Sequence, residues 1–301
     1  MTPAPVDKRI KALRRFGASI TAFTIAGAFF LGFEDSWAQP LVSLAVAYPL
    51  ELGLETLDAW STRRPVRYRG GFLALVHFLL PAHITALSIG LLLYPNQRLM
   101  PIVFATAVAI ASKFLFRAPV GGGWRHFLNP SNVGISLTLV LFPWVGIAPP
   151  YHFTENIFGV WDWVVPGAVL ASGTMLNAKL TGKGPLILGW TVAFAAQAVV
   201  RGLVFGTPLV AGLLPMTGLV FVLYTNYMIT DPGTTPIARR SQVAFGVATA
   251  AVYGVLVSVH IVFGLFFALT IVSACRGLGL YLLAARSLAA QPAPVPARPV
   301  P

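Results

Sequence analysis

The sequence has few of the groups on which most soluble enzymes rely. Charged residues make up only 10% of its 301 residues, and Cys275 is the single cysteine. One cysteine excludes an internal disulfide, a Cys-x-x-Cys pair and an iron–sulfur cluster held by this chain alone. No combination of nucleophile, base and oxyanion hole indicates a hydrolase or a transferase. Of the five histidines, His83 and His260 are the pair that could be considered as haem ligands. A histidine in a membrane helix more often hydrogen-bonds to a neighbouring helix.

Apolar residues are abundant instead, at 56% of the chain. They form recurring runs of roughly the 20 residues that cross a bilayer as a helix. The alternating ten-residue segments of a membrane β-barrel are not seen. The sequence therefore predicts an all-α fold, a polytopic membrane helix bundle with about ten transmembrane helices. The expected spans are 16–33, 39–57, 71–94, 98–116, 130–146, 160–178, 184–206, 208–228, 241–259 and 261–284.

The basic residues predict the orientation of these spans. Lysine and arginine concentrate in short cytoplasmic loops. With the N-terminus inside, 19 of the 21 Lys and Arg residues fall on the cytoplasmic side, and only Arg98 and Arg201 lie outside. We therefore expect both termini in the cytoplasm, and we assign the net charge of +12 to a basic face against anionic lipid rather than to nucleic acid. Six tryptophans fall near span ends as expected interfacial anchors: Trp37, Trp60, Trp124, Trp144, Trp161 and Trp163.

The span pattern divides the chain into three parts. Residues 1–15 are a basic cytoplasmic N-terminus, and residues 16–287 are the transmembrane domain. Residues 288–301 are rich in proline and alanine and carry too little apolar surface to pack, so we expect a disordered tail.

Ionisable residues inside membrane spans are costly and are functional hypotheses by default. Glu51 and Glu55 are four residues apart, on one face of the second expected span. Glu55 can reach the interface, whereas Glu51 needs an arginine or lysine from a neighbouring helix. A structural ion pair and a proton-handling carboxylate both fit Glu51. Lys113 and Arg201 lie near span ends, where they can snorkel to the interface, and no transport role is assigned to them.

Two loops carry the most information. Each places an Asn/Asp-Pro step between two apolar spans, at Asn129-Pro130 and at Asp231-Pro232. Such a step stops one helix and can cap the next, which permits a discontinuous site at a positive helix end. Two ordinary loops are the alternative. The similar context about a hundred residues apart suggests an internal two-fold repeat, parallel or inverted. The expected site residues are Asn129, Ser131, Asn132, Thr230, Asp231 and Thr234.

The same two regions resemble a known family. FLNPSNVGISLTLVLFP (127–143) and MITDPGTTPIARRSQVAFG (228–246) are similar to the signature regions of two related membrane proteins, RnfD of the Rnf electron-transport complex and NqrB of the sodium-pumping NADH:quinone reductase. Within that superfamily the chain most resembles the membrane proteins of enediyne biosynthesis clusters, known as UnbU-like, through FPWVGIAPPYHFTEN (142–156). The resemblance covers roughly residues 100–285.

The resemblance implies a bacterial plasma-membrane protein with ten helices, related to urea-transporter-like bundles, that works with other membrane subunits. It also implies riboflavin-type cofactors and electron flow coupled to sodium or proton movement. The family's redox subunits attach FMN to the threonine of an S-G-A-T loop, and that motif is absent. Ser172-Gly173-Thr174 is the nearest sequence to it, and it lies inside an apolar span where small residues favour helix packing. Non-covalent flavin stays open, because it needs only an apolar slot and a few polar groups.

Two classes of function follow. The first is transmembrane transport of an ion or small molecule by a bundle that has lost the covalent redox site. The second is a redox subunit that binds flavin and passes electrons within a membrane complex. The fold alone does not choose between them.

The missing attachment motif predicts that the protein carries no covalent flavin. Intact-mass spectrometry of protein made in its own host should give the mass of the polypeptide alone, because Thr174 sits in helical backbone that shields it from an attaching enzyme. Thr234 and Thr235 are the other candidates, on the opposite side from the family's attachment loop. An FMN-sized addition on any of these three threonines would contradict this prediction and favour the redox subunit.

Overall fold

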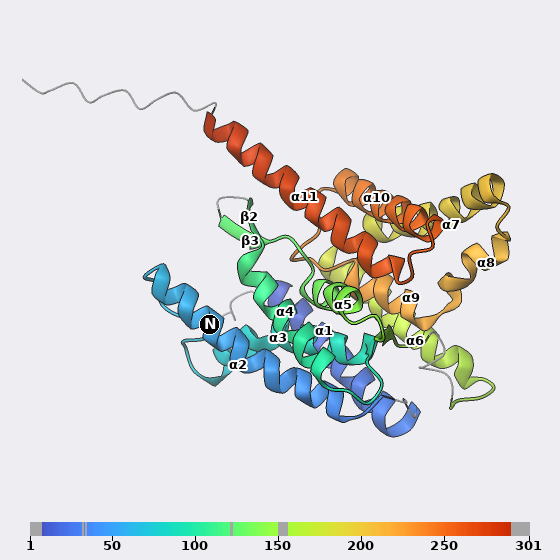
Figure 1. Ribbon diagram of the computed structural model, residues 1–301. Helices are drawn as coiled ribbons and strands as arrows, with labels where there is room; N and C mark the ends of the chain where they lie inside the picture. The colour runs from blue at the N-terminus through green and yellow to red at the C-terminus, as the bar shows by residue number, and fades with distance from the viewer. Residues whose placement is uncertain (1–7, 32, 34, 121–122, 150–155, 290–301) are drawn as a thin grey trace, which may run out of the picture.

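The computed structural model describes residues 8–289 apart from residues 32, 34, 121–122 and 150–155. Over this range the chain is a helical bundle with very little sheet, so the all-α class is confirmed (Figure 1). The α-helices are α1 (Lys8–Ala26), α2 (Ala38–Ser61), α3 (Phe72–Leu92), α4 (Met100–Leu115), α5 (Pro130–Leu141), α6 (Trp161–Leu176), α7 (Gly184–Phe205), α8 (Leu209–Leu213), α9 (Leu219–Leu223), α10 (Arg239–Ser258) and α11 (Gly264–Ala289).

Short segments of other geometry extend or join these helices. Three are π-helical and one is a 3₁₀ turn: η1 (Gly27–Leu31), η2 (Asn177–Thr181), η4 (Tyr224–Met228) and the 3₁₀ turn η3 (Leu214–Thr217). The strands form two antiparallel pairs, β1 (Leu93–Tyr94) with β4 (Gly146–Ile147) and β2 (Arg117–Val120) with β3 (Gly123–His126).

Each expected span contains a helix, but ten membrane crossings are not confirmed. By length and composition four helices could cross a membrane: α3, α7, α10 and α11. A fifth candidate joins α8–η3 to α9–η4 across a bend of 66°. Helix α5 has only 12 residues, or about 18 Å at 1.5 Å per residue, against a hydrocarbon core of about 30 Å. It is a half-length element within the bundle.

Three boundaries differ from the sequence prediction. Helix α1 begins at Lys8, so the basic N-terminal segment is partly helical. The expected span 208–228 is not one helix, because the chain turns at Gly218, which has extended backbone. Helix α11 continues to Ala289, past the expected start of the tail at 288. Residues 290–301 of that tail lie outside the described residues.

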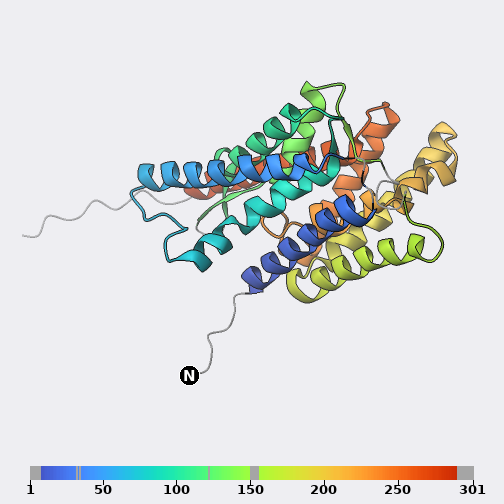
Figure 2. The ribbon, with the colours of Figure 1, turned by 90° about the horizontal axis from the view of Figure 1, so that it is seen from below.

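Helix packing follows a similar order in the two halves of the chain. In the first half α2 packs on α3 and α4, α1 on α3, and α4 on α5. In the second half α7 packs on α8 and α10, α6 on α9, and α10 on α11. The halves meet where α5 contacts α11 and where α1 contacts α6 and η2 (Figures 1 and 2).

Glycines set the closest helix contacts. A Cβ atom on Gly134 of α5 would lie 2.3 Å from the backbone oxygen of Ala105 in α4. A Cβ atom on Gly246 of α10 would lie 2.7 Å from both the oxygen of Leu186 and the nitrogen of Trp190 in α7. Small residues permit such backbone approach in membrane bundles, where van der Waals packing drives helix association.

Aromatic rings fill the space between α7, α9 and α10. Trp190 is fully buried, and its ring centroid lies 5.3 Å from that of Phe194, 5.7 Å from Phe221 and 5.4 Å from Tyr224. In contrast, the six tryptophans expected at span ends are all at least 43% exposed. Their exposure agrees with the expected position of these six tryptophans at span ends.

The loops gather in two groups, one at each end of α2. Near the end of α2, Asp58 pairs with Arg117 of β2 at 3.0 Å, which joins the α2–α3 and α4–α5 connections. Near its start, the side-chain amide of Gln39 donates to the oxygen of Asn96 at 3.4 Å. Strand β1 pairs with β4 in this second group, and Asn156 donates to the oxygen of Leu31. Connections that alternate along the chain therefore lie together in space.

The close contact at Gly246 predicts a specific sensitivity to added volume. Gly246→Ala places a methyl group against backbone atoms that cannot rotate away, so the free energy of unfolding should fall by about 1–3 kcal/mol. Gly279→Ala in α11 is the matched control, because nothing lies within 4 Å of a Cβ atom there. Thermal unfolding in detergent should show a lower Tm for the first variant only. Equal Tm values would contradict the α7–α10 packing.

Candidate functional site

Asn129 organises the first Asn/Asp-Pro loop. Its backbone is extended (φ −67°, ψ 119°), and it caps α5 by accepting from the backbone N–H of Asn132 at 3.1 Å. The same oxygen accepts from the hydroxyl of Ser131 at 3.0 Å. Pro130 follows at the first helical position, where its missing N–H costs nothing. Asn129, Ser131 and Asn132 are all at most 7% exposed, so the positive end of α5 lies inside the protein.

Asp231 organises the second loop in a different way. Its carboxylate accepts from the backbone N–H of Gly233 at 3.0 Å and from the hydroxyl of Thr234 at 2.9 Å. The hydroxyl of Thr235 donates to the Asp231 carbonyl at 2.6 Å. The carboxylate thus closes its own turn. Thr230, Thr234 and Thr235 are buried, and Asp231 itself is partly exposed.

A side chain of the first loop hydrogen-bonds to the end of η4, just before the second loop. The Nδ2 group of Asn129 donates to the carbonyl oxygen of Met228 at 2.9 Å, where η4 ends. A helix end leaves carbonyls without intrahelical partners and a helix start leaves N–H groups without them. Asn129 therefore serves the last carbonyls of η4 and the first N–H groups of α5 at once. The six expected site residues come from two segments that the structure places in contact.

Sequence reasoning missed a second link, made by asparagines of two π-helical segments. Asn177 of η2 donates to the carbonyl of Asn226 in η4 at 2.7 Å and to that of Gly173 at 2.9 Å. The hydroxyl of Thr230 donates to the same Asn226 carbonyl at 2.6 Å. A π-helical turn interrupts the regular α-helical hydrogen bonds and leaves backbone carbonyls that such side chains can bind. Two asparagines in otherwise apolar spans were the signal that could have found this link.

Two cations hold the second loop, and both were absent from the predicted site. Lys183 donates to the carbonyl of Pro236 at 2.7 Å, and Arg276 of α11 donates to that of Thr234 at 2.9 Å. Neither forms an ion pair within the described part of the chain. Lys183 is 3% exposed. Burial lowers the pKa of its ammonium to about 8, against the opposite influence of the nearby Asp231 carboxylate.

The expected partner of Glu51 is present. Lys113 of α4 lies 2.6 Å from the Glu51 carboxylate, and only 10% of the lysine side chain is exposed. The ion-pair interpretation of Glu51 is therefore confirmed. The expectation that Lys113 snorkels to the interface is wrong, because a carboxylate on the neighbouring helix binds the ammonium inside the bundle.

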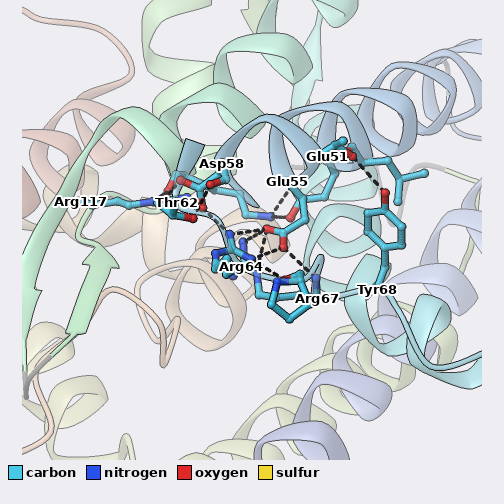
Figure 3. Close-up of polar contacts among 12 residues, drawn as sticks. Glu51, Glu55, Asp58, Thr62, Arg64, Arg67, Tyr68 and Arg117 are labelled. Carbon is cyan, nitrogen blue, oxygen red and sulfur yellow. Dashed lines mark hydrogen bonds and ion pairs between the residues drawn. The ribbon is translucent and has the colours of Figure 1, made fainter. Parts of the chain in front are cut away.

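Glu55 is buried and paired as well. Arg64 and Arg67 fold back over it at 2.6 Å and 2.5 Å. Arg64 also contacts Asp58, which pairs with Arg117, so one network joins α2, the following loop and β2 (Figure 3). Buried carboxylates are stable only when paired in this way.

His83 and the Ser172-Gly173-Thr174 segment both contribute to helix packing. Both ring nitrogens of His83 are engaged, with the hydroxyl of Thr21 at 2.8 Å and that of Tyr48 at 2.7 Å. This confirms the hydrogen-bonded interpretation, whereas His260 is exposed at the α10–α11 turn. A Cβ atom on Gly173 would lie 2.6 Å from that of Asn226, as expected for a packing glycine. Thr174 faces outward on α6.

Comparison with known proteins adds no family assignment: no protein-family model matches the chain, and no curated protein matches it. Within the described residues no group of three or more His, Cys, Asp or Glu side chains could hold a metal ion. The site offers carbonyl and hydroxyl oxygens, the Asp231 carboxylate, amide donors and two cations on carbonyls.

The Glu51–Lys113 pair predicts an asymmetric mutational response. Glu51→Gln leaves a buried ammonium without its counter-charge and should lower the free energy of unfolding by about 3–5 kcal/mol. Adding Lys113→Met removes that charge and should recover most of the loss. Arg67→Gln is the matched control, because Glu55 keeps Arg64 and the Arg67 side chain is 55% exposed. Chemical or thermal unfolding checks this, and a double variant no more stable than Glu51→Gln would contradict the pairing.

Proposed function

We propose that the protein is a ten-span integral membrane transporter for an ion or a small molecule, with its functional centre where the two Asn/Asp-Pro loops meet. The observation that carries the proposal is the Asn129–Met228 hydrogen bond. It joins a half-length helix to a broken one inside an apolar bundle. Discontinuous helices of this kind form substrate and ion sites in transporters, because freed backbone groups and helix ends face the pathway.

The two groups of loops support ten crossings with both termini inside. Every connection in the group at Asp58 and Arg117 is one that the charge distribution places in the cytoplasm. The group at Gln39 and Asn96 contains three of the connections expected outside, α1–α2, α3–α4 and α5–α6. Strict alternation is what ten crossings require, and α2 becomes compatible with lipid once Glu51 and Glu55 are paired.

The packing order supports a repeat of five elements in each half. The pairs α2–α4 and α4–α5 correspond to α7–α10 and α10–α11. Five crossings per half would make the repeat inverted, since an odd number reverses the direction of the second half. The two loops then do not occupy equivalent positions in the repeat. The first precedes the fifth element of its half, α5, and the second precedes the fourth element of its half, α10. The contact between the loops, and not the repeat, then explains why their residues are similar.

The proposal includes an evolutionary relationship to the membrane subunits that the two signature regions resemble. It also includes association with partner subunits, as in that family. The alternative is a redox subunit that holds flavin without a covalent bond. The hydrogen bonds of Thr234 and Thr235 inside their own turn leave these hydroxyls engaged, which supports the expectation that neither carries a covalent flavin.

Reconstitution into vesicles tests transport directly. We expect flux above protein-free vesicles for at least one of four probes, sodium, potassium, urea or glycerol, read with ion-sensitive dyes or by osmotic swelling. Asn129→Asp keeps the helix cap but places a carboxylate against the Met228 carbonyl, and it should reduce that flux. Gly279→Ala is the control. No flux with any probe, together with a flavin spectrum released by acid, would replace this proposal with the redox alternative.

The same assay has a predicted pH dependence. Lys183 is charged below about pH 8 and neutral above it, so its hold on the Pro236 carbonyl weakens as pH rises. The flux should therefore change with a midpoint near pH 8. Lys183→Arg keeps its charge throughout this range and should move the change to higher pH. An unshifted midpoint would show that another group titrates.

A further inference from the structure

Arg201 is a cation with no acidic partner in the membrane-embedded part of α7. It lies one turn before the helix ends at Phe205. Within the described residues its side chain forms no ion pair, and its Nε atom is buried without a hydrogen bond. An unpaired arginine in this position is costly unless something outside the protein compensates its charge. The snorkelling expected from the sequence is therefore only partial.

The neighbouring polar groups are also without partners. Gln197 lies one turn earlier on α7, and both polar atoms of its amide are buried and unbonded. A Cβ atom on Gly254 of α10 would lie 3.2 Å from its Oε1 atom. A polar seam thus runs between α7 and α10, with Arg201 at its outer end.

The surface around Arg201 is apolar and open. The exposed apolar side chains toward this end of the two helices include Val200 at 56%, Leu203 at 82%, Val204 at 65%, Phe205 at 63%, Val255 at 63% and Val259 at 60%. A contiguous apolar surface that surrounds one uncompensated cation matches a molecule with hydrocarbon chains and an anionic group. A free anion would satisfy the guanidinium alone and leave the apolar surface uncovered.

We propose that the α7–α10 face binds an anionic phospholipid, with its phosphate on the guanidinium of Arg201 and an acyl chain along Val200 and Val204. The outward nitrogens of Arg201 donate to the phosphate oxygens, an arrangement that suits the planar guanidinium. Gln197 is a positioning residue, since its amide oxygen can receive the buried Nε–H and fix the guanidinium. A lipid with net negative charge is preferred, because no acid in this seam offsets the arginine.

Native mass spectrometry of the full chain, delipidated in detergent, tests this site. With phosphatidylglycerol or phosphatidylethanolamine added, wild-type protein should bind the first more tightly. Arg201→Gln should weaken phosphatidylglycerol binding about tenfold, as expected for losing a charge-assisted hydrogen bond. Arg98→Gln is the matched control, because Arg98 stacks on Trp144 at 4.7 Å and lies in the connection between α3 and α4. It should leave binding unchanged.

Further arms separate the remaining outcomes. Arg201→Lys keeps the charge and should retain most of the lipid preference even if Arg201→Gln folds poorly. Gln197→Leu should weaken binding less than Arg201→Gln does. Displacement of the lipid by millimolar inorganic phosphate would show a free-anion site and overturn the lipid assignment. Equal binding by Arg201→Gln and Arg98→Gln would overturn the site itself.

Discussion

The structure depends on one constraint, that polar backbone exposed by broken helices must find partners inside an apolar bundle. Asn129 satisfies this constraint where the end of η4 lies beside the start of α5. Its oxygen caps α5 and its nitrogen binds the carbonyl of Met228, so one amide serves two helix ends. Aspartate or serine could supply the cap, but neither supplies the second bond. The contact between the loops therefore follows from the identity of a single residue.

Charge pairing completes the same end of the bundle. Glu51 binds Lys113 of α4, and Asp58 binds Arg117 of β2. These two ion pairs connect α2 to the segment that leads to Asn129. The opposite end is held by the short β1–β4 pair and by weaker amide contacts. The two ends of the bundle are thus held by different interactions, ion pairs at the end with the two loops and backbone and amide hydrogen bonds at the other.

Local chemistry explains which features could be predicted. Long apolar runs located helical structure in every expected span, although the span 208–228 is broken at Gly218. The cost of a buried carboxylate required a partner for Glu51. The environment of Lys113 was predicted wrongly. The sequence shows its distance to the end of a span, but it does not show the carboxylate of another helix that lies beside it. The bend at Gly218 and the role of Asn177 were also missed. The bend depends on an extended residue between a 3₁₀ turn and α9, and the Asn177 link depends on π-helical geometry and a contact between distant segments. Periodicity encodes none of these.

Hydrogen exchange in the Asn129→Ser variant tests the link between the loops most directly. Serine keeps an oxygen that can cap α5 but has no amide to bind the Met228 carbonyl. The account predicts faster deuterium uptake over residues 228–235, a segment that begins 99 residues away from the substitution, with little change in the first turn of α5. Unchanged uptake over residues 228–235 would show that the two loops do not depend on Asn129 and would contradict the account.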